Sequence, residues 1–336
     1  MSEDAHQAPP QDEPAPPGAP APHVPPEVPP VLFAAHARIA VDDAVAIDDL
    51  SVVTRGDRVL FVGDVTVLFA ALSGVPLLAA VPDSATPAGD TALAGEARVV
   101  GGDVRLHGQD VAAQAHLAVA GFAPLDPPVP RTMTSLAYVT WAARLAGAHP
   151  RAATEMAATA LRRVGLETAM LRPPAVLGVA ERRALQLAKA IVHGPPVLVA
   201  EAPLDRLEGA AAAFVAGALS AATEGRRALL SARRIDPATA EGVIARAASH
   251  LVLLGDRGIL AEGSPAELAS GARIYHLTVA ANAEPLRDAL AARGLTLARG
   301  PLHFTVALPD GVTTAALIEA ASEARAPIVE LSPLLG

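Results

Sequence analysis

Few residues of this 336-residue chain have types and spacing suited to chemistry. Cysteine is absent, which excludes disulfide scaffolds, thiolate zinc sites and cysteine nucleophiles. The ten histidines are scattered without a helical pair at metal-ligand spacing. Neither a Gly-x-Ser-x-Gly elbow nor a Gly-x-Gly-x-x-Gly loop occurs. Of the 26 basic residues only Lys189 is a lysine, so any chemistry that needs a lysine depends on this one side chain.

Charge and composition exclude further classes. The net charge is −9, and residues 1–30 contribute five acidic residues and no lysine or arginine. The rest of the chain is close to neutral, so we expect no nucleic-acid partner. The arginine pairs at 162–163, 182–183, 226–227 and 233–234 are expected on solvated faces. The 11 prolines of residues 1–30 predict a disordered acidic tail, which is either simply solvated or binds a partner.

No secretory signal is visible, because the N-terminus is acidic and rich in proline. The uncharged run 65–82 is barely long enough to span a membrane. It contains glycine and proline, so we expect a buried helix followed by a loop and a strand, and no transmembrane segment. These features predict a cytoplasmic protein that is at most peripheral to the inner face of the cell membrane.

The elements that would position a site alternate between short apolar strands and amphipathic helices. Such alternation predicts a parallel sheet covered on both faces. Strands are expected at 31–40, 44–53, 58–63, 117–120, 197–200, 227–231 and 250–254, with hairpins at 97–107, turning at Gly101-Gly102, and from 254 to 261. Helices are expected at 66–73, 135–147, 151–164, 181–192, 207–222, 237–248 and 265–270.

The last 64 residues form a separate unit. Their pattern predicts a strand at 274–279, a helix at 284–292, strands at 296–298 and 303–308, a helix at 313–324 and a strand at 327–331. This βαββαβ order is ferredoxin-like. The predicted organisation is therefore a tail at 1–30, an α/β domain at 31–272 with a helical subdomain at about 134–178, and a small α+β domain at 273–336.

The order of landmarks over residues 31–272 resembles the ATP-binding subunits of ABC transporters. The segment that starts at Leu177-Gly178-Val179-Ala180-Glu181 looks like the family's signature and the helix that follows it. The segment 196–203 looks like the Walker B strand, and Leu207-Glu208 stands at the D-loop. The resemblance implies a P-loop NTPase-like core whose mixed sheet carries a β-subdomain and a helical subdomain. The C-terminal unit is similar to an appendage that many such subunits carry.

The residues that would bind phosphate in that family are missing. Gly63-Asp64-Val65-Thr66 stands where the family has Gly-x-x-x-x-Gly-Lys-Ser/Thr, and the loop is about four residues short. Only Gly63 remains of the glycines, and Asp64 would place a like charge beside phosphate. Thr66 is either the remnant of the Mg²⁺-binding hydroxyl or, more simply, a helix cap or core residue.

At the other positions where the family has catalytic or nucleotide-binding residues, this chain also has different residues. Leu125 replaces the glutamine that follows the family's proline, Ala202 replaces the general-base glutamate, and Arg233 replaces the switch histidine. Glu201 retains a carboxylate at the Walker B position and is either a ligand for a weakly held Mg²⁺ or simply a solvated carboxylate at a strand end. In the signature, Gly178, Val179 and Ala180 replace Ser-Gly-Gly, whereas Leu177 and Glu181 persist with equally good structural roles.

Three hypotheses follow. We favour a degenerate subunit that binds ATP and Mg²⁺ weakly or not at all and is a structural or regulatory partner of a membrane permease, an intact ATPase subunit, or both. The resemblance supports a permease partner, because the apolar helix at 135–147 corresponds to the region that docks on the membrane subunit. The second hypothesis is a working ATP-hydrolysing subunit with atypical motifs. The third is a partner-binding module that acts through the C-terminal unit or the tail.

Overall fold

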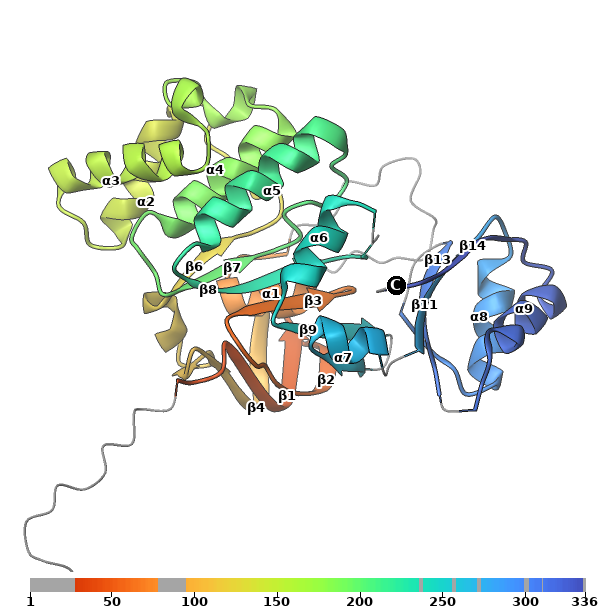
Figure 1. The fold of residues 1–336 in the computed structure, drawn as a ribbon. Coiled ribbons are helices and arrows are strands. Elements are labelled where there is room, and N and C mark those ends of the chain that lie inside the picture. The colour runs from red at the N-terminus through yellow and green to blue at the C-terminus, as the bar shows by residue number, and fades with distance from the viewer. Residues whose placement is uncertain are drawn as a thin grey trace, which may run out of the picture.

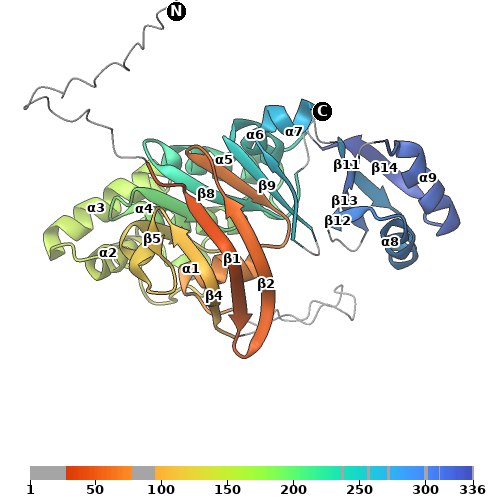
Figure 2. The same cartoon turned by 90° about the horizontal axis from the view of Figure 1, so that it is seen from below.

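The computed structural model describes residues 28–77, 95–235, 238–255, 258–270, 273–298, 302–309 and 311–334. Three sheets organise these residues (Figures 1 and 2). Most of the tail expected at 1–30 lies outside the described residues, as does part of the apolar run 65–82. Among the described helices, none combines the length and the apolar character that crossing a bilayer requires.

The central sheet has six strands in the order β10-β9-β3-β8-β7-β6, all parallel except β10. Its strands are β3 (Arg58–Val62), β6 (Ala120–Ala123), β7 (Val197–Ala200), β8 (Arg227–Ala232), β9 (His250–Gly255) and β10 (Gly258–Gly263). Alternate residues of β3 enter two different apolar cores, with Leu60 and Val62 in one and Val59 and Phe61 in the other. The sheet is therefore covered on both faces, as the sequence predicts.

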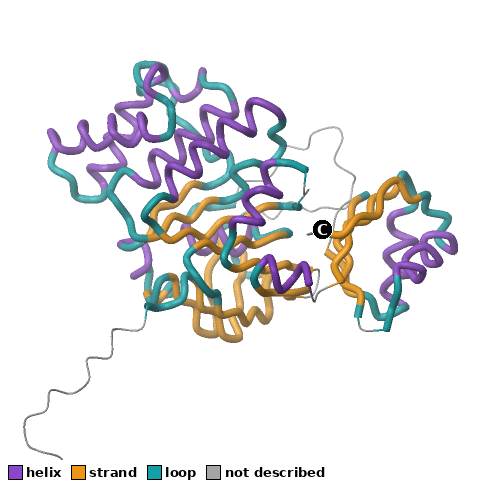
Figure 3. Tube along the Cα trace, viewed as in Figure 1, coloured by secondary structure: helices purple, strands orange, loops and turns teal. Residues whose placement is uncertain are grey.

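Helices lie on one side of this sheet and a second sheet lies on the other, as Figure 3 shows. The helices are α2 (Ser135–Leu145), α3 (Pro150–Arg163), α4 (Val179–Ile191), α5 (Gly209–Thr223) and α6 (Ala240–Ala247). We call residues 126–178, which leave the sheet after β6 and return at the start of α4, the helical arm. The arm also contains two short 3₁₀ helices, Glu167–Ala169 and Pro174–Val176.

The second sheet is antiparallel, with the order β2-β1-β4-β5. It comprises β1 (Leu32–Val41), β2 (Ala44–Val53), β4 (Ala97–Leu106) and β5 (Gln109–Asp110), and α1 (Thr66–Ser73) packs between it and the central sheet. The hairpin predicted with its turn at Gly101-Gly102 is wrong, because β4 runs through both glycines. The turn falls at His107-Gly108, where φ is 51° and 77°, the pair of positive φ values that a type I′ turn needs.

Gly101-Gly102 instead marks an irregularity in the pairing of β4 with β1, whose register shifts between Ala35 and Arg38. Gly102 has φ +76°, and a Cβ there would lie 2.2 Å from the carbonyl oxygen of His36. The glycine pair thus permits a bulge and close backbone approach, which is the alternative meaning of glycine inside a strand.

The strand predicted at 117–120 is also largely wrong. The first two of its four residues belong to a 3₁₀ helix, Ala115–Ala118, and only Ala120 belongs to β6. The buried His116 ring places Nε2 2.7 Å from the carbonyl oxygen of Leu72, at the end of α1. This contact holds the segment as a turn against α1, so its apolar residues do not extend into the sheet.

The C-terminal unit confirms the predicted βαββαβ order. After α7 (Pro265–Ser270) come β11 (Arg273–Val279), α8 (Ala283–Ala292), β12 (Thr296–Ala298), β13 (His303–Leu308), α9 (Thr314–Glu323) and β14 (Ile328–Pro333). The sheet order is β12-β13-β11-β14 with all pairs antiparallel, which is the ferredoxin-like arrangement. Figure 1 shows α8 and α9 on the face turned away from the central sheet.

Candidate functional site

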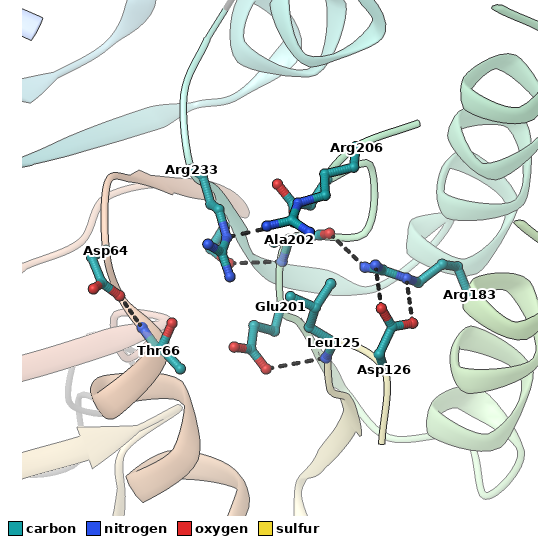
Figure 4. A network of polar contacts seen from close by, with 11 residues as sticks. Asp64, Thr66, Leu125, Asp126, Arg183, Glu201, Ala202, Arg206 and Arg233 are labelled. Carbon is teal, nitrogen blue, oxygen red and sulfur yellow. Dashed lines mark hydrogen bonds and ion pairs between the residues drawn. The ribbon is translucent and has the colours of Figure 1, made fainter. Parts of the chain in front are cut away.

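The carboxyl ends of β3, β6, β7 and β8 meet at one edge of the central sheet, which is where ligands bind in open α/β sheets. A small hollow of about 210 Å³, open to solvent, lies there. It is lined by Gly63, Val65, Thr66, Leu125, Glu201, Ala202, Ser231, Ala232 and Arg233. Residues predicted from four separate segments therefore come together around one hollow (Figure 4). That volume includes open solvent, and the enclosed part has room for about one water molecule, far less than a small-molecule pocket.

The short loop after β3 does not form a phosphate cradle. The Gly63 N–H donates to the carbonyl oxygen of Ala232 at 3.0 Å. The Thr66 N–H donates to the exposed Asp64 carboxylate at 3.2 Å. Both backbone donors are thus already occupied, one of them by an anionic side chain. Gly63 has a packing role, since its φ is +122° and a Cβ would lie 2.9 Å from the carbonyl oxygen of Leu254.

Glu201, at the end of β7, points into the hollow and accepts a hydrogen bond from the Leu125 N–H at 3.1 Å. Burial raises the pKa of Glu201 above its ordinary value. The Leu125 N–H and the nearby Arg233 and Arg183 guanidinium groups act in the opposite direction, whereas Asp64 adds a further upward effect. Leu125 therefore contributes its backbone to the site and supplies no side-chain amide.

Ala202 and Arg233 stand where the sequence resemblance predicts a general base and a switch residue, and neither side chain can accept a proton from water. The Ala202 N–H donates to the buried Ser231 Oγ at 2.9 Å. Arg233 Nε lies 3.5 Å from the Asp205 carboxylate, which also has Arg206 within 3.9 Å. Arginine remains protonated in proteins, so Arg233 presents only donors here.

The signature positions lie outside the hollow. Gly178 caps α4, and its N–H donates to Glu181 Oε2 at 2.8 Å, while Glu181 Oε1 accepts from Arg172 at 2.8 Å. Leu177 is buried beside them. Glu208 precedes α5 as an exposed residue and makes no side-chain cap. In this structure Glu181 and Leu177 thus have the capping and packing roles that the sequence offers as alternatives.

The sequence analysis does not identify two residues at the edge of the site, Arg183 and Asp126. Arg183 donates to both carboxylate oxygens of Asp126, at 3.1 and 2.9 Å, and to the carbonyl oxygen of Ala202 at 2.9 Å. Its side chain is only 5% exposed, so the expectation that all the arginine pairs lie on solvated faces is wrong for Arg183. It is also wrong for Arg227, which is 14% exposed and bridges Asp57, Gly56 and Pro29. The register of Arg183 within α4, beside buried apolar positions, is the signal that could have revealed it.

The side chains around the hollow do not fit Mg²⁺ or a nucleotide phosphate. Among the described residues, no group of three His, Asp or Glu side chains is close enough to hold a metal ion. Glu201 is the one carboxylate that lines the hollow, and Lys189 lies on α4 away from that lining. Burial disfavours the charged form of Lys189 and lowers the pKa of its amine to about 8.

The raised pKa of Glu201 has a measurable consequence for stability. The carboxyl of Glu201 has a higher pKa in the folded state than in the unfolded state, so the folded protein keeps the proton to a higher pH. The free energy of unfolding therefore falls as the pH rises from the pKa of the unfolded state through the pKa of the folded state. We expect Glu201→Gln to gain stability relative to the parent chain as the pH rises from about 4 to about 7. Urea unfolding at both pH values measures this, with Glu208→Gln as the exposed control. An advantage of Glu201→Gln that stays constant with pH would contradict it.

The comparisons with known proteins concern the fold. No family model matches the sequence, and no curated protein matches it either. Solved structures do match. CbiO1 from Clostridium perfringens, part of the ABC transporter complex CbiONQ, has TM-score 0.55 and 14% identity, over 78% of this chain and 95% of that one. MJ1267, an ATP-binding cassette of an ABC transporter, has TM-score 0.52 and 16% identity, over 70% and 91%. An ATP-binding subunit of an ABC transporter has TM-score 0.50 and 15% identity, over 88% and 99%.

Proposed function

We propose that this chain, which has the fold of the ATP-binding subunits of ABC transporters, is a non-hydrolysing structural or regulatory subunit. One observation carries the proposal. The positions that would bind phosphate, hold Mg²⁺ and activate water surround one hollow, and each has lost its chemical group or engages it within the protein. The protein thus retains the scaffold without the reacting groups.

Magnitudes favour this proposal over an active enzyme with atypical motifs. Removing one preorganised electrostatic group from an active site typically costs about 10²–10³ in rate. The loop lysine, the general base and the switch histidine are absent together, so residual chemistry would be negligible. Arg233 cannot replace the lysine through simple charge, because Asp205 is its ion-pair partner.

The partner is expected to be a membrane permease, an intact ATPase subunit, or both. CbiO1 is part of an ABC transporter complex, which supports the proposal that this chain is bound peripherally at the cytoplasmic face of a membrane. The candidate docking face lies on α2, where Trp141 is 51% exposed and Leu145 is 68% exposed one turn later. The rings of Trp141 and the buried Tyr138 are stacked with their centroids 6.4 Å apart, so Tyr138 supports one side of the exposed ring. Exposed aromatic residues on a rigid support are typical of interaction hot spots.

Docking can be tested with vesicles of the native membrane and the purified full chain. We expect the double variant Trp141→Ser, Leu145→Ser to co-sediment at least about tenfold less than the parent chain, because a buried tryptophan anchor contributes about 2 kcal/mol or more. The control is Ile318→Ser, which changes an apolar residue on α9 that is 53% exposed. If Ile318→Ser abolished binding and the α2 variant did not, the C-terminal unit would be the partner-binding module instead.

A further inference from the structure

Arg183 joins the two ends of the helical arm. Asp126 lies where the chain leaves β6 for the arm, and Arg183 lies in the second turn of α4, where the chain returns. The fork of two hydrogen bonds between them therefore closes the arm at its base. The third hydrogen bond of Arg183 reaches the Ala202 carbonyl just beyond β7, so the closed arm is also tied to the central sheet (Figure 4).

The backbone around this contact is unusual. Ala202 has φ +38°, in the left-handed region that alanine rarely adopts, and Asp126 has φ +43°, which aspartate adopts more readily than most residues. Such conformations persist where surrounding contacts over-determine them. Arg183 contacts both residues, through the carboxylate of Asp126 and the carbonyl of Ala202, so its guanidinium group contributes to holding both.

A second set of hydrogen bonds reinforces the same junction. The Leu125 N–H donates to Glu201, and the Ala202 N–H donates to Ser231 Oγ. The ends of β6, β7 and β8 are thus connected through groups of the chain itself. The Arg183 side chain is 5% exposed, whereas Asp126 is 52% exposed, so their charge-assisted contact is shielded from water on the Arg183 side alone.

We propose that Arg183 is a positioning residue that fixes the helical arm on the central sheet from within the chain, so that the orientation of the arm, and of the α2 face, does not respond to Mg-ATP. This inference rests on the proposed function and adds how the docking face is held. A partner would then bind the α2 face in one orientation, whether or not Mg-ATP is present. The helical arm would not change its orientation in response to nucleotide.

Hydrogen exchange of the full chain, with and without millimolar Mg-ATP, tests the proposal. In the parent chain, peptides covering 124–145 are expected to exchange at the same rate in both conditions. In Arg183→Gln, exchange in 135–145, whose first amides donate to Arg172, Met170 and Thr134, should rise by about tenfold or more, because the local opening of the arm becomes easier. The matched control is Arg182→Gln, which removes a hydrogen bond to the Leu177 carbonyl at 2.7 Å that closes the signature turn without reaching Asp126 or Ala202. It should leave 135–145 within about twofold of the parent.

Asp126→Asn provides a second variant should Arg183→Gln not fold. Asparagine accepts the left-handed backbone of Asp126, so this change removes the charge and leaves the local conformation allowed. Equal exchange in Arg183→Gln or Asp126→Asn and in the parent would overturn the proposal. A change in the parent's arm on adding Mg-ATP would also overturn it. If that change occurred without phosphate release, the fixed arm would be refuted while the non-hydrolysing role would stand.

Discussion

Gly121→Ala should lower the free energy of unfolding by about 3 kcal/mol or more, the upper end of the cost of overpacking. Gly121 lies in β6, and a Cβ there would sit 1.9 Å from the carbonyl oxygen of Ala190 in α4 and 2.9 Å from Pro195. The first of these contacts is with backbone, so no rotamer change can relieve it. Either the helix or the strand has to move, and both belong to the core that supports the hollow.

Urea unfolding measures this effect against Gly217→Ala. Gly217 lies inside α5, and nothing lies within 4 Å of its added Cβ. Alanine is the better helix former, so this control should stabilise the protein by about 0.5–1 kcal/mol. Opposite signs for the two glycines are the expected outcome. Equal effects would mean that α4 and β6 are not packed as described.

Asp126→Ala should destabilise the protein more than Arg183→Met does. Removing Asp126 leaves the buried guanidinium group without its ion-pair partner, and loss of such a partner typically costs about 3–5 kcal/mol. We expect the lower end, since Asp126 itself is 52% exposed and water screens part of the interaction. Removing Arg183 leaves a carboxylate that water can reach, so its cost should be about 1–2 kcal/mol.

A double-mutant cycle on these residues provides the internal control. Asp126→Ala combined with Arg183→Met removes the buried guanidinium group together with its ion-pair partner, so the double variant should be more stable than Asp126→Ala alone. The expected departure from additivity is about 1 kcal/mol or more. Additive losses, or a larger loss for Arg183→Met, would show that the pair is solvated and does not hold the arm.

The sequence predicts most elements well because apolar periodicity determines them locally. The helix at 66–73 and the strand at 197–200 agree residue for residue with α1 and β7. The errors occur where a distant contact decides the conformation. Gly101-Gly102 looks like a turn until β1 pairs across it, and residues 117–120 look like a strand until His116 packs against α1.

In the candidate site, too, local sequence predicts some features and distant contacts determine the others. The sequence identifies the positions that surround the hollow, because each follows a buried strand and parallel strands bring their carboxyl ends together. The sequence does not identify the groups with which these residues form hydrogen bonds. Arg183 belongs to a charged pair on an amphipathic helix, and only the three-dimensional register of α4 against β6 and β7 places its guanidinium group beside Asp126.

Phosphate release from saturating Mg-ATP by the purified full chain is the most direct test of the proposed function. Glu201→Ala, which removes the one carboxylate lining the hollow, is the matched variant. We expect the parent chain and Glu201→Ala to release phosphate at the same rate as a protein-free buffer. Mg²⁺-dependent turnover by the parent chain that is lost in Glu201→Ala would contradict the proposal and establish an active ATPase.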